Sequence, residues 1–266
     1  MQDASNRFTR RVDNYIKYRP HYPQAVLDLL KAECSLTPAR VVADAGSGTG
    51  ILAELLLKNG IPVFGIEPDP DMRAGAEHHL RAYPRFTSVA ATAEATTLPD
   101  HSVDFVTAGQ AFHWFNPEHA RKEFARILAR QGWVVLVWNI QRTSGTPFLV
   151  ALDRFWKNEQ FWNKDRIQKF GAAAWRSGYE RGRQEVLEPL FRPSAFKEQV
   201  FENPLVCDME GLKGRVFSTC PALEAEDPRY TVMLEELEGM FRAYQESGTV
   251  TIEQDAVVIY GQLPLE

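Results

Sequence analysis

An acidic residue and three closely spaced glycines end the first apolar run of the chain. The stretch "VVADAGSGTG" spans residues 41–50 and holds Asp44, Gly46, Gly48 and Gly50. Glycine lets a backbone adopt left-handed conformations and approach a ligand closely. Where such a loop joins a parallel strand to a helix, the N–H groups at the helix start face the crevice in which these sheets bind ligands. The stretch therefore predicts a nucleotide-type ligand site.

The spacing of these residues narrows the ligand. A dinucleotide fingerprint reads G-x-G-x-x-G, whereas here the third glycine comes two residues after the second. The carboxylate of Asp44 would repel a pyrophosphate but tolerate an ammonium group, directly or through a water. Glu67 ends the next predicted strand, where an acid can accept hydrogen bonds from both hydroxyls of a ribose. These residues suit a ligand with a ribose and an amino-acid tail but no phosphate.

Four stretches together carry a family resemblance: "VVADAGSGTG", "VFGIEPDPDM", "TAEATTLPDHSVDFVTAGQAFHWF" and "ILARQGWVVLVWN". The sequence resembles the class I S-adenosylmethionine-dependent methyltransferases, and most of all the small-molecule branch that includes the trans-aconitate and quinone-biosynthesis enzymes. The resemblance covers residues 8–140. It implies S-adenosyl-L-methionine as cofactor, S-adenosyl-L-homocysteine as product, no metal, and methyl transfer to a small-molecule acceptor through a carboxylate or a hydroxyl.

The resemblance also implies which residues bind the cofactor. The glycine loop would line the methionine moiety, Glu67 would hold the ribose, and Gln110 would sit near the sulfur. Many relatives carry an aspartate where Thr92 stands; here the backbone of Ala93 could contact the adenine instead. The full implied set is Asp44, Gly46, Ser47, Gly48, Gly50, Glu67, Pro68, Met72, Thr92, Ala93, Glu94 and Gln110.

The segment "AFHWF" follows the fourth predicted strand, at the ligand edge of the sheet. The unperturbed pKa of a histidine lies near neutrality, so His113 is a candidate general base. Trp114 is a candidate wall of the acceptor pocket. Packing of these rings against the next helix is an open alternative for both residues.

The N-terminal stretch "DNYIKYRPHYP" supplies three more acceptor candidates, Tyr15, Tyr18 and Arg19. In relatives this segment folds across the cofactor. A guanidinium suits bidentate binding of a carboxylate, which could belong to the cofactor or to the acceptor. An N-terminal helix that only packs on the sheet is the alternative.

Short apolar strands alternate with amphipathic helices over the first 140 residues. This order predicts an α/β, Rossmann-like, doubly wound sheet whose strands are mostly parallel. With the resemblance, the expectation is seven strands, an antiparallel final strand and a helical insertion after the fifth. The predicted strands are 39–46, 61–67, 86–91, 103–109, 132–139, 196–206 and 249–263, and the predicted helices are 22–34, 51–60, 69–82, 116–132 and 229–245.

Three parts are predicted along the chain. Residues 1–140 form the cofactor-binding core with N-terminal covering helices, residues 141–195 a helical insertion that acts as a lid, and residues 196–266 the elements that complete the sheet. The insertion is rich in aromatic residues between 148 and 191. Such aromatic side chains either cover an apolar acceptor or form an ordinary core.

Composition limits the partners. The formal net charge of −5 and the lack of a long Lys/Arg run argue against a nucleic-acid substrate. Three unpaired-looking cysteines, no signal segment and no apolar run of spanning length favour a cytoplasmic protein. Monomer and homodimer both remain open. Two other functions also stay open: a non-catalytic partner subunit that binds the cofactor, and a nicotinamide-dependent oxidoreductase.

Overall fold

The computed structural model describes residues 16–162, 187–191, 195–219, 223 and 225–263. The chain divides into two compact units. We call residues 21–139, 177–201 and 256–266 the sheet unit. Residues 1–20, 140–176 and 202–255 are the helical unit. Tyr15 and the predicted lid residues 163–186 lie outside the described residues.

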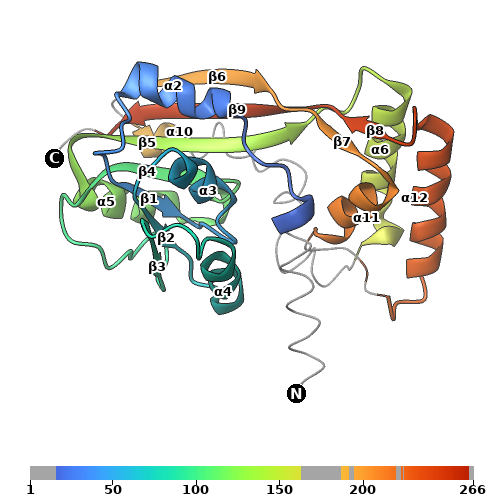
Figure 1. Ribbon diagram of the computed structural model, residues 1–266, viewed down its shortest axis with the longest axis horizontal. Helices are drawn as coiled ribbons and strands as arrows, with labels where there is room; N and C mark the ends of the chain where they lie inside the picture. The colour runs from blue at the N-terminus through green and yellow to red at the C-terminus, as the bar shows by residue number, and fades with distance from the viewer. Residues whose placement is uncertain (1–15, 163–186, 192–194, 220–222, 224, 264–266) are drawn as a thin grey trace. The chain divides into compact units, whose positions relative to one another are not determined.

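The main sheet has seven strands in the order β3-β2-β1-β4-β5-β9-β6 (Figure 1). The first five are parallel, with β1 paired to both β2 and β4. β9 runs opposite to its neighbours β5 and β6 (Figure 1), so the predicted fold class is confirmed. The strands are β1 (Val42–Ala45), β2 (Val63–Ile66), β3 (Phe86–Val89), β4 (Val103–Gly109), β5 (Leu128–Gln141), β6 (Phe196–Glu202) and β9 (Gln254–Gln262).

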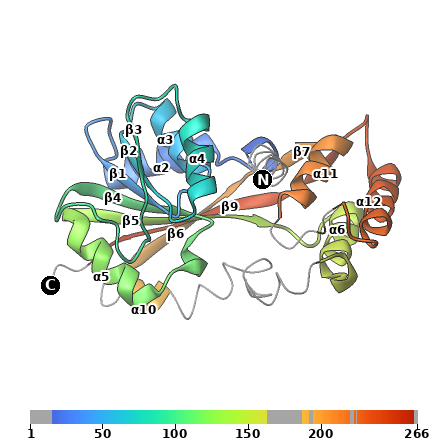
Figure 2. The ribbon, with the colours of Figure 1, turned by 90° about the horizontal axis from the view of Figure 1, so that it is seen from below.

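Helices cover both faces of this sheet. α2 (Gln24–Cys34) and α3 (Ile51–Lys58) lie on one face, and α5 (Pro117–Ile127) and α10 (Leu187–Phe191) lie on the other (Figure 2). α4 (Pro70–His79) follows β2. The strand order reverses between β1 and β4, and ligands of open α/β sheets bind at the carboxyl ends of the strands at such a point. The glycine loop follows β1 at this position.

The core of the sheet unit explains why these segments become helices and strands. α3 buries Leu52, Ala53, Leu56 and Leu57, which recur at helical spacing along one stripe. They pack in one cluster with Phe105 of β4, which is 1% exposed. β4 lies between two strands and is buried along most of its length, as expected for a parallel strand covered on both faces.

The helical unit has its own core. It comprises α6 (Pro147–Lys157), α11 (Met209–Phe217), α12 (Tyr230–Tyr244) and the antiparallel pair β7 (Leu205–Cys207) and β8 (Val250–Ile252). The rings of Trp156 and Trp162 stack with centroids 5.0 Å apart, and Phe155 packs edge-on against both. The aromatic residues of the predicted insertion that the structure describes between 148 and 162 are therefore core residues of this unit.

Three sequence predictions of local structure were wrong, and one helix was missed. The helix expected over 116–132 ends at Ile127, because Leu128 is already extended and pairs with Val103 as the first residue of β5. The strands expected over 196–206 and 249–263 are each two strands, since β7 and β8 pair with each other whereas β6 and β9 join the main sheet. α11 was not predicted.

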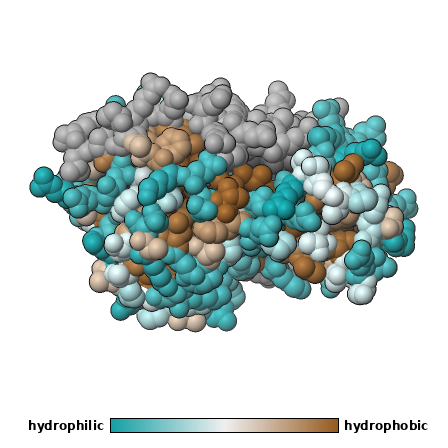
Figure 3. Space-filling model, turned by 90° about the horizontal axis from the view of Figure 1, so that it is seen from above, coloured by the Kyte–Doolittle hydropathy of each residue, from teal (hydrophilic) through white to brown (hydrophobic). Residues whose placement is uncertain are grey.

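Hydrophilic and hydrophobic residues both lie on the surface. In the face shown in Figure 3, hydrophilic residues are interspersed with hydrophobic ones. No helix within the described ranges combines the length and apolarity that crossing a membrane requires.

Phe105→Ala tests the packing of the central strand. Because the ring is fully buried, its removal should lower the free energy of unfolding by about 3–5 kcal/mol. Denaturant unfolding followed by circular dichroism would measure the change. Val200→Ala on β6 is the control, since Val200 is 47% exposed and its truncation should cost at most about 0.5 kcal/mol. Equal losses in the two variants would contradict this description of the core.

Candidate functional site

The loop between β1 and α3 requires its glycines. Gly46, Gly48 and Gly50 have φ angles of +64°, +55° and +84°, a region that other residues adopt only with strain. A Cβ added at Gly46 would lie 2.6 Å from the Cβ of Ala111, and one added at Gly50 would lie 2.5 Å from Leu80 Cδ1. The loop therefore accepts no side chain at these two positions without displacing its neighbours.

Glu67 holds this loop in place from the end of β2. Its Oε2 accepts a hydrogen bond from the backbone N–H of Gly48 at 2.9 Å, and its Oε1 accepts one from the N–H of Asp69 at 2.9 Å. Asp69 in turn caps the start of α4. Burial raises the pKa of Glu67, and the two N–H donors oppose that rise. Each carboxylate oxygen can accept a further hydrogen bond, so the group can still bind a diol.

Asp44 is a buried carboxylate with an incomplete set of partners. It is 1% exposed, and its Oδ1 accepts a hydrogen bond from the Thr107 hydroxyl at 2.7 Å. Its Oδ2 is buried and makes no hydrogen bond to any residue that the structure describes. Burial raises the pKa of Asp44 to about 7, against the lowering effect of Thr107. A buried carboxylate oxygen without a donor is unfavourable, and a cationic or N–H-bearing ligand would relieve that cost.

The residues that the resemblance places beside an adenine lie on the loop after β3. Thr92 is exposed and Ala93 is buried. The carboxylate of Glu94 accepts a hydrogen bond from the N–H of Asn116 at 2.8 Å, which ties the loop to the start of α5. Pro68 is exposed and Met72 is half-buried, and the Met72 methyl group lies 3.7 Å from where a Cβ of Gly48 would stand.

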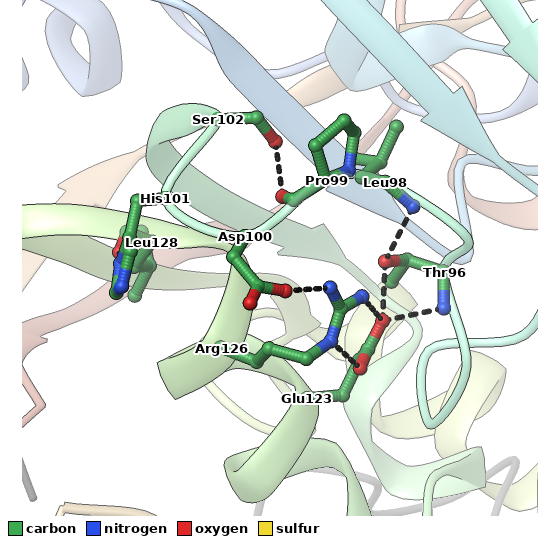
Figure 4. Close-up of polar contacts among 9 residues, drawn as sticks. All are labelled: Thr96, Leu98, Pro99, Asp100, His101, Ser102, Glu123, Arg126 and Leu128. Atoms are coloured by element: carbon green, nitrogen blue, oxygen red, sulfur yellow. Dashed lines mark hydrogen bonds and ion pairs between the residues drawn. The ribbon is translucent and has the colours of Figure 1, made fainter.

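A network of hydrogen bonds and ion pairs, centred on the buried side chains of Thr96 and Glu123, anchors the same loop further along (Figure 4). The N–H and hydroxyl of Thr96 both donate to Glu123 of α5, at 2.7 and 2.5 Å. Arg126 donates to the same carboxylate at 2.7 and 2.8 Å and also binds Asp100. Although burial acts in the opposite direction, donation by Arg126 and Thr96 lowers the pKa of Glu123. The sequence analysis missed this network; the acid and base three residues apart on α5 were its only local signal.

The end of β4 is held in an unusual conformation. Gln110 has a φ angle of +55°, which is uncommon for a residue with a side chain. Its side-chain Nε2 donates to the carbonyl of Asn139 on β5 at 2.9 Å. The side chain is therefore engaged at the carboxyl edge of the sheet, and its predicted place near a sulfonium stays a prediction.

The short 3₁₀-helix η1 (Phe112–Trp114) follows directly. Ala111 and Phe115, which flank it, are the residues that a Cβ at Gly46 would strike, so the turn packs on the glycine loop. The Nδ1 of His113 is buried and has no hydrogen-bond partner among the described residues. Burial lowers the pKa of His113 to about 4. Trp114 lies with its ring 4.9 Å from the His113 ring and is 51% exposed.

The two described N-terminal candidates belong to the helical unit. Arg19 donates to the carbonyl of Ser218 at 2.9 Å. The ring of Tyr18 lies against Gly214 of α11, where an added Cβ would come within 2.1 Å of it. These contacts are with α11 and the residue that follows it, and not with the sheet on which the packing alternative placed this segment. A substrate role for Tyr18 and Arg19 stays a prediction. The described residues contain no group of three or more His, Cys, Asp or Glu that could hold a metal ion.

Asp44→Asn tests the cost of the buried carboxylate. The pKa is about 7 in the folded protein and 3.8 in the absence of perturbation, so the folded state holds the proton more tightly. Through this group, the free energy of unfolding falls as the pH rises from about 4 to about 7 and then stays low. At about pH 8 the variant should be more stable than the wild type, on the order of a few kcal/mol.

Melting temperatures between about pH 5 and pH 8 would measure the effect, within the range where most domains stay folded. Asp28→Asn on α2 is the control, because Asp28 is exposed and the same change there should be neutral. A less stable Asp44→Asn protein at the alkaline end would argue against a raised pKa.

Part of the chain is similar in sequence to known methyltransferases. Residues 43–136 match the family model of a methyltransferase domain. Over 138 residues the chain is 38% identical to an uncharacterized methyltransferase of Mycobacterium tuberculosis (strain ATCC 25618 / H37Rv), covering 52% of this chain and 54% of that protein. It is 30% identical over 138 residues to an uncharacterized methyltransferase of Schizosaccharomyces pombe, with the same shares covered. The match spans about half the length of these curated relatives.

One solved structure has a similar fold over almost the whole length of both chains. The solved structure of a "Putative Type II Methyltransferase from Anaeromyxobacter dehalogenans" superposes with a TM-score of 0.61 at 23% identity. The superposition covers 93% of this chain and 99% of that chain, and at this identity it speaks for the fold alone. Family model, sequence similarity and strand order together confirm the resemblance at the level of the class: residues 43–136 are a methyltransferase domain of the class I, S-adenosylmethionine-dependent type. The resemblance to the trans-aconitate and quinone-biosynthesis branch stays a prediction.

Proposed function

We propose that this chain is an S-adenosyl-L-methionine-dependent methyltransferase whose acceptor is a small molecule. The observation that carries the proposal is the buried Asp44 carboxylate, whose Oδ2 lacks a partner among the described residues. A site built for a phosphate-bearing nucleotide would not place an uncompensated negative charge behind its glycine loop. A ligand with a cationic amino-acid end supplies the missing charge.

The residues present fit this cofactor. Asp44 would hold the ammonium end, directly or through a water, beside the side-chain-free surface of Gly46 and Gly48. Glu67 would accept hydrogen bonds from the ribose hydroxyls with the lone pairs that the backbone N–H groups leave free. The loop that contains Ala93 would contact the adenine. The Glu94 and Glu123 hydrogen bonds support this role by fixing the position of that loop.

The cofactor would supply an activated methyl group with a neutral thioether as leaving group. The protein then needs chiefly to align the two reactants and exclude water. Alignment alone can supply about 7–11 kcal/mol of the barrier. The rigidity of the glycine loop supports this role, since Glu67 fixes its centre and its N–H groups at Gly46 and Ser47 donate to Ile66 at 2.8 and 3.1 Å.

We further propose that the acceptor is a carboxylic acid or a hydroxyl compound. This assignment rests on the resemblance to small-molecule methyltransferases and on the net charge of −5, which disfavours a nucleic acid. We also propose that the chain has the three predicted parts: a core of residues 1–140, an insertion of residues 141–195 and a closing segment of residues 196–266.

Isothermal titration calorimetry with S-adenosyl-L-methionine tests the cofactor assignment. Asp44→Asn and Glu67→Gln should each weaken binding about 10- to 100-fold, as expected when a hydrogen bond to a charged group is lost. Glu77→Gln is the matched control, because Glu77 is exposed on α4 and should bind as the wild type does. Undiminished binding in both site variants would defeat the assignment.

The pH dependence of the same titration gives a second prediction. Because ionised Asp44 attracts the cationic ligand and protonated Asp44 does not, wild-type affinity should rise as the pH passes through about 7. Asp44→Asn should abolish that dependence. A wild-type affinity that is flat between about pH 6 and pH 8 would remove Asp44 from the binding site.

A screen for S-adenosyl-L-homocysteine release would test catalysis. Small carboxylic acids and phenols are the first acceptors to offer. Cofactor binding without release in any reaction would favour a binding subunit over an enzyme.

A further inference from the structure

The position of His113 suggests a role that the cofactor assignment leaves open. η1 is packed on the glycine loop through Ala111 and Phe115, which come within 2.6 and 3.2 Å of the Cβ position at Gly46. His113 lies between these two contact residues in the chain. The turn that carries it therefore follows the carboxyl end of β4 and packs on the loop that forms the centre of the proposed cofactor site.

The turn that carries His113 is firmly held. Phe112 is 0% exposed, and the ring of Phe115 packs edge-on against those of Phe112 and Phe124. The backbone N–H of Trp114 donates to Ala111 at 2.9 Å. A side chain on such a turn is preorganised, which is what positioning of a reactant requires.

The ring leaves one nitrogen available to a ligand, and in the tautomer whose lone pair lies on Nδ1 that nitrogen accepts a hydrogen bond. Nδ1 is buried without a partner among the described residues, and a buried ring nitrogen without a partner is unfavourable. The described part of the site offers no carboxylate hydrogen-bonded to this ring. The low pKa keeps the imidazole neutral near neutral pH, so that one ring nitrogen carries a lone pair.

We propose that His113 is a catalytic residue that accepts the proton of a neutral hydroxyl acceptor, such as a phenol or an enol, through Nδ1. The inference rests on the proposed methyltransferase function. The acceptor oxygen forms the new bond to the transferred methyl carbon while the C–S electron pair leaves with the sulfur. The hydroxyl proton passes to Nδ1, and the imidazolium then loses it to water. A carboxylate acceptor is already ionised and therefore needs no general base.

The first measurement separates this proposal from the proposed function. His113→Gln and wild type should bind S-adenosyl-L-methionine equally in calorimetry, because the residue acts on the acceptor. If the wild type does not bind the cofactor, the proposed function fails. If only the variant loses binding, His113 belongs to the cofactor site and the present proposal fails.

The second measurement compares acceptors of different acidity. Wild type and His113→Gln are assayed with phenol, with pentafluorophenol and with benzoate. Loss of the base should lower turnover of phenol about 10²- to 10⁴-fold, and that of ionised pentafluorophenol less than about tenfold, because it has no proton to give. Equal losses on both phenols, or wild-type turnover of benzoate alone, would overturn the proposal.

A spectroscopic readout does not depend on turnover. In protein labelled with ¹⁵N-histidine and saturated with S-adenosyl-L-homocysteine, addition of phenol should shift the Nδ1 resonance of His113. Addition of benzoate should leave it unchanged. His119→Gln is the control variant for every arm, since His119 is exposed on α5 and should behave as the wild type does. An Nδ1 resonance that phenol leaves unmoved would contradict the contact.

Discussion

The two hydrogen bonds accepted by Glu67 connect the parts from which the site is built. One oxygen binds the N–H of Gly48 and the other binds the N–H of Asp69, each at 2.9 Å. The glycine loop that follows β1 and the helix that follows β2 are thereby held at one carboxylate. Charge-assisted bonds of this kind are stronger than bonds between neutral groups. A side chain whose proposed task is to bind a ribose therefore also fixes the loop that would surround the rest of the cofactor.

Asp44 lowers the stability of the folded protein near and above neutral pH. Its burial raises the pKa to about 7, and one of its oxygens lacks a donor among the described residues. Thr107 offsets part of that cost from the adjacent strand β4. The remaining cost is a property of the ligand-free protein and would be relieved when a cation binds. Buried charged groups that lack a partner are typical of functional sites, where the bound ligand provides the missing interaction.

The two units use aromatic residues differently. In the helical unit, Trp156 and Trp162 stack and form a core with α11 and α12. In the sheet unit, the rings around η1 are divided: Phe112 is buried, whereas Trp114 is 51% exposed beside His113. An exposed tryptophan next to a half-buried histidine at the ligand edge differs from core packing. This contrast favours η1, whose residues lie within the family match at 43–136, as the place of the acceptor chemistry.

The sequence by itself determined the sheet, the glycine loop and the place of Glu67. These follow from periodicity and from the rule that parallel strands end at one edge, so that a strand's last residue is positioned by its own segment. Only the tertiary structure decided which groups meet. Thr107 and Asp44 are 63 residues apart, and Thr96 and Glu123 are 27 apart. Helix α5 ends early because Leu128 pairs with a distant strand, and the aromatic residues between 148 and 162 form a core because α11 and α12 pack against them. A local sequence pattern does not indicate which distant residues will be in contact.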